Sequence, residues 1–245
     1  MALQLAAGTR FAGSAAVFRF SGAQGLARVT RRCIALLGGS FDPVHNGHVA
    51  LGKYFVTLLA PDELRIIPTG NPWQKHGLQA SGADRIEMVR RAFGNLHVPV
   101  CIDEQEIRRN SATYTIDTLR AVREELGPET SLVFLIGADQ LQHLDTWQEW
   151  QHMFDLAHIC AASRPGFDID AAHVSSAVAR EFVRRAGTAA HIRDSPHGLT
   201  YTATNLAIDI SATEIRAALH RGTAPEALMP PGVLDYIQQH HLYKS

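Results

Sequence analysis

The sequence has few of the features that mark several large classes of protein. It holds 3 cysteines in 245 residues, and Cys33, Cys101 and Cys160 lie too far apart for a zinc spacing or a disulfide framework. Polar or charged residues interrupt every apolar run well before the roughly 20 residues that a membrane-spanning helix needs. We therefore expect a soluble protein of a reducing, cytoplasmic compartment, with three buried and inert thiols.

An excess of charge is also missing, since 23 Lys and Arg stand against 24 Asp and Glu. Residues 1–32 contain five arginines and no acidic residue, which leaves 18 basic and 24 acidic residues from position 33 onward. A domain with this balance has no general field that attracts a polyanion, so local donors must bind one. We expect neither nucleic acid nor a membrane as a partner, and we leave open whether copies associate.

Residues 1–32 show no sustained apolar period, and three interpretations are open. The Arg-containing, acid-free composition fits a transit peptide, whereas a secretory signal fits poorly because no basic start precedes a long apolar stretch. We favour a disordered extension or a start codon assigned too far upstream. The prediction is a single domain over residues 33–245.

From Cys33 onward, short apolar runs alternate with longer stretches of helical period. This pattern predicts a doubly wound α/β fold, in which helices cover both faces of a parallel sheet, with helical additions at the C-terminus. The expected strands are 34–37, 64–67, 98–102, 132–136 and 157–161. The expected helices are 47–59, 82–93, 115–126, 147–154, 171–185, 212–220 and 231–240, and residues 187–205 read as a loop.

The first strand runs into Gly-Gly-Ser-Phe-Asp-Pro-Val-His-Asn-Gly-His at residues 38–48, and a helix follows. Gly38 and Gly39 allow a close approach of the backbone to a ligand, and a helix start offers free N–H groups, so phosphate is the natural guest. The sequence matches neither the Walker motif nor the Gly-x-Gly-x-x-Gly fingerprint. His45 and His48 could instead bind zinc, or could cap the helix beside an Asp42-Pro43 turn, but we favour contact with phosphate.

A second motif, Ile-Ser-Ala-Thr-Glu-Ile-Arg at residues 210–216, precedes another helical stretch. Ser211 and Glu214 alone read as a capping box, which leaves Arg216 without a role. The two motifs together resemble the signatures of the nucleotidyltransferase superfamily, the first being related to the His-Ile-Gly-His motif of class I aminoacyl-tRNA synthetases. This resemblance implies a Rossmann-like fold and a triphosphate held between two helix starts.

Adenylyl transfer to a phosphate needs alignment and charge stabilisation rather than a general base, because the attacking oxygen is already deprotonated. We expect direct in-line attack without a covalent intermediate, and Mg²⁺ bound mainly to the substrate phosphates and waters. The candidates for charge stabilisation are His45, His48 and Arg216. The expected ATP-binding residues are these three with Gly38, Gly39, Ser40, Phe41, Gly137, Asp139, Arg164, Ser211 and Thr213.

The acceptor is read from the segments between the motifs. Residues 67–76 offer a cation and amides, residues 108–115 offer a helix start, and Asp145-Thr146-Trp147 offers an aromatic plane. Each also has an ordinary interpretation: Lys75 as a solvated lysine, Thr113 or Thr115 as a cap, and Trp147 as a core aromatic.

These segments resemble the bacterial nicotinate-nucleotide adenylyltransferase family over residues 33–245, although residues 167–205 carry no motif that aligns. The resemblance implies ATP and nicotinate mononucleotide as substrates and nicotinate adenine dinucleotide as product, within NAD biosynthesis. The residues it implies for the mononucleotide are Asn71, Lys75, Tyr114, Thr115 and Trp147. Alternatives are transfer to nicotinamide mononucleotide or phosphopantetheine, and a regulatory module that binds nucleotide without turnover.

Overall fold

The computed structural model describes residues 31–70, 77–109, 111–162, 174–203, 206 and 210–244, apart from the side chain of Ala138. Three predicted site residues, Asn71, Lys75 and Arg164, lie outside this part of the chain. Among the described residues, no helix combines the length and the apolar character that a membrane span requires.

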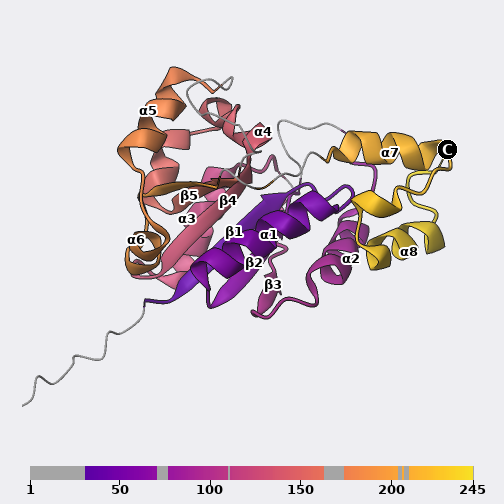
Figure 1. Cartoon of the computed structure of the whole chain (residues 1–245), viewed down its shortest axis with the longest axis horizontal. Coiled ribbons are helices and arrows are strands. Elements are labelled where there is room, and N and C mark those ends of the chain that lie inside the picture. The colour runs from indigo at the N-terminus through magenta and orange to yellow at the C-terminus, as the bar shows by residue number, and fades with distance from the viewer. Residues whose placement is uncertain are drawn as a thin grey trace, which may run out of the picture.

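A six-stranded sheet forms the centre of the molecule (Figure 1). Its strand order is β3-β2-β1-β4-β5-β6, and every neighbouring pair is parallel. This arrangement confirms the predicted doubly wound α/β class, and the strand order reverses between β1 and β4. The strands are β1 (Cys33–Gly39), β2 (Glu63–Pro68), β3 (Val100–Ile102), β4 (Ser131–Gly137), β5 (His158–Ala162) and β6 (Thr200–Ala203).

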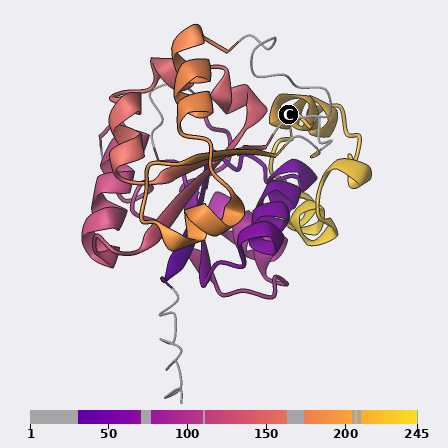
Figure 2. The ribbon, with the colours of Figure 1, turned by 60° about the vertical axis from the view of Figure 1, so that its left-hand side comes forward.

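Helices cover both faces of the sheet, as the turned view in Figure 2 shows. One face packs against α1 (Asn46–Leu59), α2 (Gly82–Phe93), α6 (Ala189–Asp194), α7 (Ala212–His220) and α8 (Pro231–Gln239). The other packs against α3 (Thr115–Leu126), α4 (Ala138–Leu141), α5 (Ser176–Arg184) and the 3-10 helix η2 (Trp150–Asp155). Two further 3-10 turns are η1 (Leu144–Thr146) and η3 (Glu226–Leu228).

Strand β1 shows why the sheet strands read as continuous apolar runs rather than alternating ones. Cys33, Ala35 and Leu37 belong to the core on the α1 and α2 side, whereas Ile34 and Leu36 belong to the core on the α3 side. All five are essentially inaccessible to solvent. Side chains that alternate between two covered faces must all be apolar, which is the sequence signature used to predict the fold.

The structure corrects three predicted elements. The 187–205 stretch is not a loop, because it contains α6 and the four-residue edge strand β6, which is too short and polar to give an apolar period. The predicted α-helix at 147–154 is replaced by a turn at 147–149 and the 3-10 helix η2, in keeping with the spacing of three that separates Trp147, Trp150 and Met153. The third strand begins at Val100 rather than at position 98.

The cysteines are free, but only two match the expectation of full burial. Cys33 and Cys160 are buried, whereas Cys101 lies half-exposed on the short edge strand β3. Removal from water raises the pKa of all three thiols. Arg31 and Arg32, which precede β1, bond to Glu129 and Glu63 of the domain. The assignment of residues 1–32 as an extension stays a prediction.

Candidate active site

Aromatic rings pack against the end of β1 and the loop that follows it. A Cβ at Gly39 would lie 3.0 Å from the ring of Phe41, and one at Gly38 would lie 3.3 Å from the ring of Phe134. Phe41 is fully buried and has a left-handed φ of 51°. The glycines therefore make room for packed rings, a reason different from the close ligand approach expected from the sequence. The ring of Phe41 packs in the core, which leaves its backbone available to contact a nucleotide.

The two histidines of the first motif lie at the start of α1, as predicted. Their rings stack with centroids 3.7 Å apart, and the edge of Phe41 contacts His48 at 4.9 Å. The backbone N–H of His45 donates to Nδ1 of His48 at 3.3 Å. A neutral His48 must then carry its proton on Nε2, which makes that atom a hydrogen-bond donor. Packing and the hydrogen bond thus fix the orientation of His48 before any ligand binds.

Asp42 connects its own loop to three other segments of the chain through hydrogen bonds. Its buried carboxylate accepts hydrogen bonds from the N–H of Gln79 at 2.9 Å, the N–H of Ala80 at 3.0 Å and the hydroxyl of Tyr243 at 2.6 Å. Its backbone carbonyl accepts a hydrogen bond from Nη1 of Arg216 at 2.6 Å. The sequence suggested only a turn at Asp42, and its role as a junction was missed.

This junction bears on the zinc alternative for the two histidines. Asp42 was the one carboxylate near them in the sequence, and three donors already occupy its oxygens. No group of three or more His, Cys, Asp or Glu side chains suited to a metal occurs in the part of the chain that the structure describes. The donor set of this loop, imidazoles and backbone amides, suits phosphate better than a metal ion.

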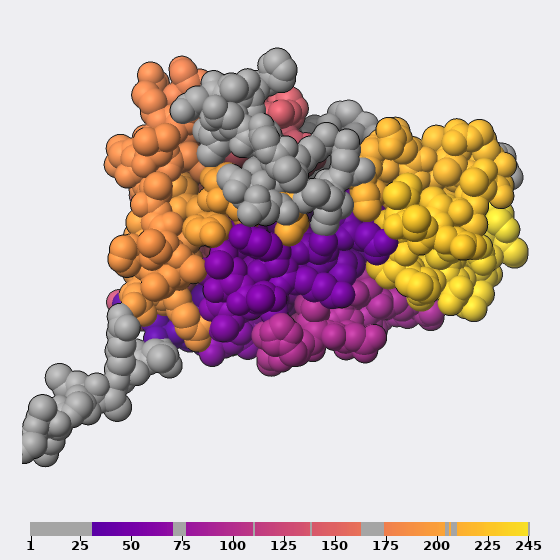
Figure 3. Space-filling model, in the orientation of Figure 1, coloured from indigo at the N-terminus to yellow at the C-terminus, as the bar shows by residue number. Residues whose placement is uncertain are grey.

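The second motif reaches the first through Arg216. Ser211 is the N-cap residue of α7, but its side chain makes no capping hydrogen bond, so the capping-box interpretation is wrong. Thr213 instead accepts a hydrogen bond from Nη2 of Arg216 at 3.3 Å, while Nη1 of Arg216 bonds to Asp42. In Figure 3 the yellow C-terminal segment lies against the purple segment that follows β1. The side-chain amide of Asn46, the first residue of α1, donates to the Ala227 carbonyl at 3.0 Å. The two predicted motifs therefore contact each other in the folded chain.

The end of β4 forms the other side of this site, because β1 and β4 are neighbours at the point where the strand order reverses. Gly137 ends the strand, and a Cβ there would lie 2.7 Å from a carboxylate oxygen of Asp139. Asp139 itself is exposed. Ligands of open α/β sheets bind at such a reversal, beyond the carboxyl ends of the strands.

The end of β2 lies beside the loop of the first motif. The N–H of Thr69 donates to the carbonyl of Gly39 at 2.9 Å. The next residue, Gly70, passes so close to Glu106 that a Cβ there would lie 1.8 Å from the Glu106 carbonyl oxygen. The predicted acceptor segment 67–76 therefore contacts the first motif directly.

A buried carboxylate connects the end of β2 to the start of α3. Glu106 accepts a hydrogen bond from the hydroxyl of Thr118 at 2.7 Å, and the N–H of Gly70 also bonds to it. Burial raises the pKa of Glu106, although these donors and Arg109 oppose the shift. Helix α3 begins at Thr115, as expected, but its N-cap residue is Tyr114, so the interpretation of Thr113 or Thr115 as the cap is wrong. Glu106 was missed, because an acidic residue in a polar stretch reads as exposed.

Trp147 packs against β4 on the face of the sheet that α3 covers. Its ring meets that of Phe134 edge-on at 6.2 Å, and Phe134 in turn lies under Gly38. The ring is half-buried against the core on the α3 side. Its Nε1 is buried and has no hydrogen-bond partner among the described residues. Trp147 thus lies one aromatic ring away from the end of β1, partly in the core and partly accessible.

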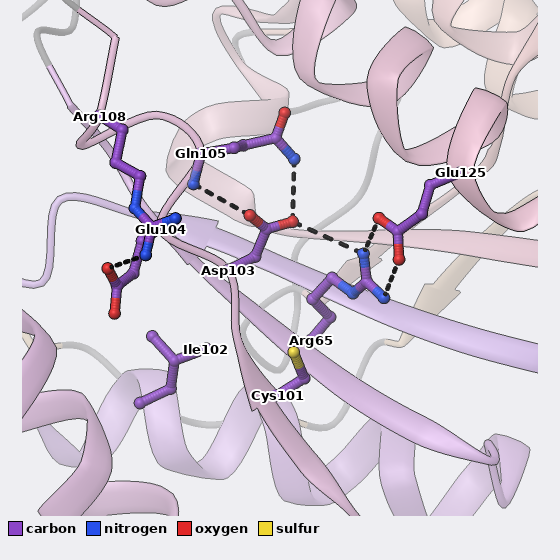
Figure 4. A pocket seen from close by; sticks show the side chains of 8 residues that line it. All are labelled: Arg65, Cys101, Ile102, Asp103, Glu104, Gln105, Arg108 and Glu125. Atoms are coloured by element: carbon purple, nitrogen blue, oxygen red, sulfur yellow. Dashed lines mark hydrogen bonds and ion pairs between the residues drawn. The ribbon is translucent and has the colours of Figure 1, made fainter.

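A pocket of about 330 Å³ lies elsewhere, at the edge strand β3 (Figure 4). Arg65 lines this pocket, and its guanidinium forms ion pairs with Glu63 at 2.9 Å, Glu125 at 2.7 Å and Asp103 at 3.6 Å. Glu125 and Glu63 raise the pKa of Arg65 and stabilise its charged form. The pocket contains none of the residues predicted for the site, and its other arginine, Arg108, is paired with Glu104 at 2.9 Å.

A glycine-containing loop at the reversal of a parallel sheet, joined to an arginine from a second helix start, is an arrangement typical of nucleotide-binding α/β proteins. A family model described as cytidylyltransferase-like matches residues 36–218. The chain is 74% identical over 214 residues to a probable nicotinate-nucleotide adenylyltransferase of Herminiimonas arsenicoxydans, covering 87% of this chain and 98% of that one. It belongs to the nicotinate-nucleotide adenylyltransferase family within the cytidylyltransferase-like proteins.

Other relatives agree. A probable nicotinate-nucleotide adenylyltransferase of Laribacter hongkongensis is 42% identical over 216 residues, covering 88% of this chain and 96% of that one. The fold is similar to that of a Plasmodium falciparum nicotinic acid mononucleotide adenylyltransferase complexed with NaAD. That comparison has a TM-score of 0.66 at 18% identity, and covers 87% of this chain and 98% of the other.

Proposed function

We propose that this enzyme transfers the AMP moiety of ATP to nicotinate mononucleotide, releasing pyrophosphate and forming nicotinate adenine dinucleotide. The observation that carries the proposal is the hydrogen bond of Arg216 to the Asp42 carbonyl, which brings both motifs to one place at the end of β1. The β- and γ-phosphates would lie between the start of α1 and the start of α7. His45, His48 and Arg216 would then face the charge that develops on the leaving pyrophosphate.

The chemistry requires little else from the protein. The mononucleotide phosphate is already an anion, so it attacks the α-phosphorus directly and in line, without a covalent intermediate. His48 donates through Nε2, the atom that its hydrogen bond with His45 leaves protonated in the neutral ring. Mg²⁺ would be held mainly by phosphate oxygens and waters, since Asp42 is occupied, and it would neutralise phosphate charge.

The acceptor would lie between the end of β2 and the start of α3. The backbone N–H groups near Tyr114 and Thr115, in the first turn of α3, would bind the nicotinate carboxylate, and Trp147 would stack on the ring. A carboxylate accepts from two N–H groups, whereas an amide presents a donor to one of them, so nicotinamide should be rejected. Asn71 and Lys75 would contact the acceptor phosphate, and Asp139 and Arg164 the ATP nucleoside.

The free cysteines support a further part of the proposal, that the enzyme works in a reducing, cytoplasmic compartment. Both substrates are small nucleotides, and neither nucleic acid nor a membrane is needed as a partner.

The test is acceptor choice. Purified enzyme with Mg²⁺ and ATP is given nicotinate mononucleotide, nicotinamide mononucleotide or phosphopantetheine in parallel, and pyrophosphate release and product mass are followed. We expect kcat/KM for nicotinate mononucleotide to exceed that for nicotinamide mononucleotide by at least about tenfold, the equivalent of one lost hydrogen bond. Equal or faster transfer to nicotinamide mononucleotide would refute the acceptor, and no transfer to any of the three would refute the function.

A further inference from the structure

Arg85 is a buried arginine on α2 that the sequence motifs do not include. It is 3% exposed, and one of its nitrogens, Nη1, donates to two backbone carbonyls. The first is Ser40, in the loop after β1, at 2.9 Å. The second is Thr69, at the end of β2, at 2.6 Å. A single nitrogen thus joins the loop proposed for ATP to the segment proposed for the acceptor.

A requirement for packing alone does not explain an arginine at this position. The neighbouring inward positions of α2 are Met88, Val89 and Phe93, which fill the core without charge. Burial lowers the pKa of Arg85, which reflects the cost of keeping a cation away from water. Its Nε is also buried without a hydrogen-bond partner among the described residues. An apolar side chain would avoid both costs.

The electrostatic surroundings of Arg85 stabilise its charge without using its hydrogen bonds. Asp42 and Glu106 attract the guanidinium, yet its hydrogen bonds go to the backbone carbonyls of Ser40 and Thr69 rather than to these carboxylates. Asp42 is occupied by Tyr243 and two backbone amides, and Glu106 by Thr118 and Gly70. Nη1 is therefore left for the two loop carbonyls.

From this geometry we propose that Arg85 is a positioning residue for the transfer, which fixes the distance between the ATP loop and the acceptor segment. The proposal rests on the function proposed above. In-line transfer needs the attacking oxygen and the α-phosphorus about 3–3.5 Å apart, and a misplacement of about 1 Å can reduce the rate about 100-fold. The side chain makes no contact with either substrate in this account and acts through the backbone of Ser40 and Thr69.

The test compares Arg85→Met and Arg85→Lys with a matched control, Arg123→Met. Arg123 is half-buried rather than buried, but burial lowers its pKa as it does that of Arg85. It too donates to backbone carbonyls, those of Thr130 at 2.7 Å and Pro196 at 2.9 Å. These carbonyls precede β4 and β6, at the opposite end of the sheet from the site. The control therefore removes the same kind of interaction and leaves the site intact.

We expect Arg85→Met to lower kcat about 100-fold at temperatures where the variant is fully folded, with KM for each substrate changed less than kcat. Arg85→Lys, whose amine reaches part of the way, should recover at least about tenfold of that loss. Arg123→Met should lower the melting temperature and leave kcat within about threefold of the parent enzyme. A kcat for Arg85→Met within threefold of the parent would overturn the proposal.

Amide hydrogen exchange gives a second readout that does not depend on the acceptor. Removing Arg85 should speed exchange in residues 38–42 and 66–70 together, and removing Arg123 should not. If the parent enzyme failed to use nicotinate mononucleotide, the proposed function would fall, while the exchange data would still decide whether Arg85 holds the two segments. Unchanged exchange at both segments in Arg85→Met would refute that role.

Discussion

The hydroxyl of Tyr243, two residues before the C-terminal residue, supports the loop of the first motif, and its removal gives a sharp prediction. Tyr243 is 6% exposed and donates to the Asp42 carboxylate at 2.6 Å. Burial and that carboxylate raise its pKa far above the ordinary value, so the hydroxyl stays protonated and remains a donor. Tyr243→Phe deletes this hydrogen bond and leaves the ring in place.

The size of the effect follows from the contacts. A hydrogen bond to a charged group contributes about 1.5–3 kcal/mol, and Asp42 keeps its bonds to Gln79 and Ala80, so we expect a loss of about 2 kcal/mol. In a protein of this size each kcal/mol corresponds to about 2–4 °C, which gives a melting temperature lower by about 4–8 °C. KM for ATP should rise, because the backbone carbonyl of Asp42 also accepts the hydrogen bond that positions Arg216. KM for the mononucleotide should not rise.

Tyr236→Phe is the matched control, measured in the same thermal denaturation and kinetic assays. Tyr236 lies on α8 and its hydroxyl donates to Asp84 at 2.9 Å, but Asp84 lies half-buried in the first turn of α2 and not in the loop. Water can reach the Asp84 carboxylate and replace the lost bond, so its loss should cost only about 1 kcal/mol and leave KM for ATP unchanged. If both variants melted alike, or if Tyr243→Phe melted within 1 °C of the parent, the account of Asp42 as a junction would be wrong.

Four further changes are predicted. His48→Ala should lower kcat at least about 100-fold in steady-state assays, and a rise in KM alone would make it a ground-state binding residue. Trp147→Ala should weaken the mononucleotide about three- to tenfold in calorimetry and leave ATP unaffected, and an unchanged Kd would place Trp147 in the core only. Gly70→Ala forces a Cβ to 1.8 Å from the carbonyl oxygen of Glu106, so KM for the acceptor should rise at least about tenfold. Gly232→Ala is its control and should not change KM, because the nearest atom to its Cβ would be 3.9 Å away. Burial lowers the pKa of His158 to about 4 from 6.5, so protonation favours the unfolded state, and about 3 kcal/mol of stability should be lost as pH falls from 6.5 to 4. Urea titrations should show a smaller loss over this range in His158→Gln, and an equal loss would exclude His158 as the cause.

The sheet and its covering helices were accessible from sequence because their signals are local. Residues such as Ile34 to Leu37 are apolar on both faces, and Gly39, His45 and His48 follow at a spacing that marks a strand, a loop and a helix start. The short elements β6 and η2 were missed or misassigned, since four edge residues or a six-residue 3-10 helix carry too little periodicity.

The supporting residues of the site could not be found in this way. Asp42, Arg85, Glu106 and Tyr243 are charged or polar residues of the kind that is ordinarily exposed, and nothing in their sequence neighbourhood shows that they are buried. Their partners lie far away in the chain: Tyr243 is 201 residues from Asp42, and Arg85 is 45 residues from Ser40. Only the folded arrangement places these groups under the two substrate segments.

The central claim is that one triphosphate lies between the two motifs, with the acceptor facing it across the ends of β1 and β2. The most direct measurement is a crystal structure with Mg²⁺, nicotinate mononucleotide and an ATP analogue whose α,β-bridge cannot be cleaved. The account predicts phosphate oxygens within hydrogen-bond distance of His48 and Arg216, and the pyridine carboxylate at the start of α3. A triphosphate bound away from Arg216, or a mononucleotide whose phosphate faces away from the α-phosphorus, would contradict it.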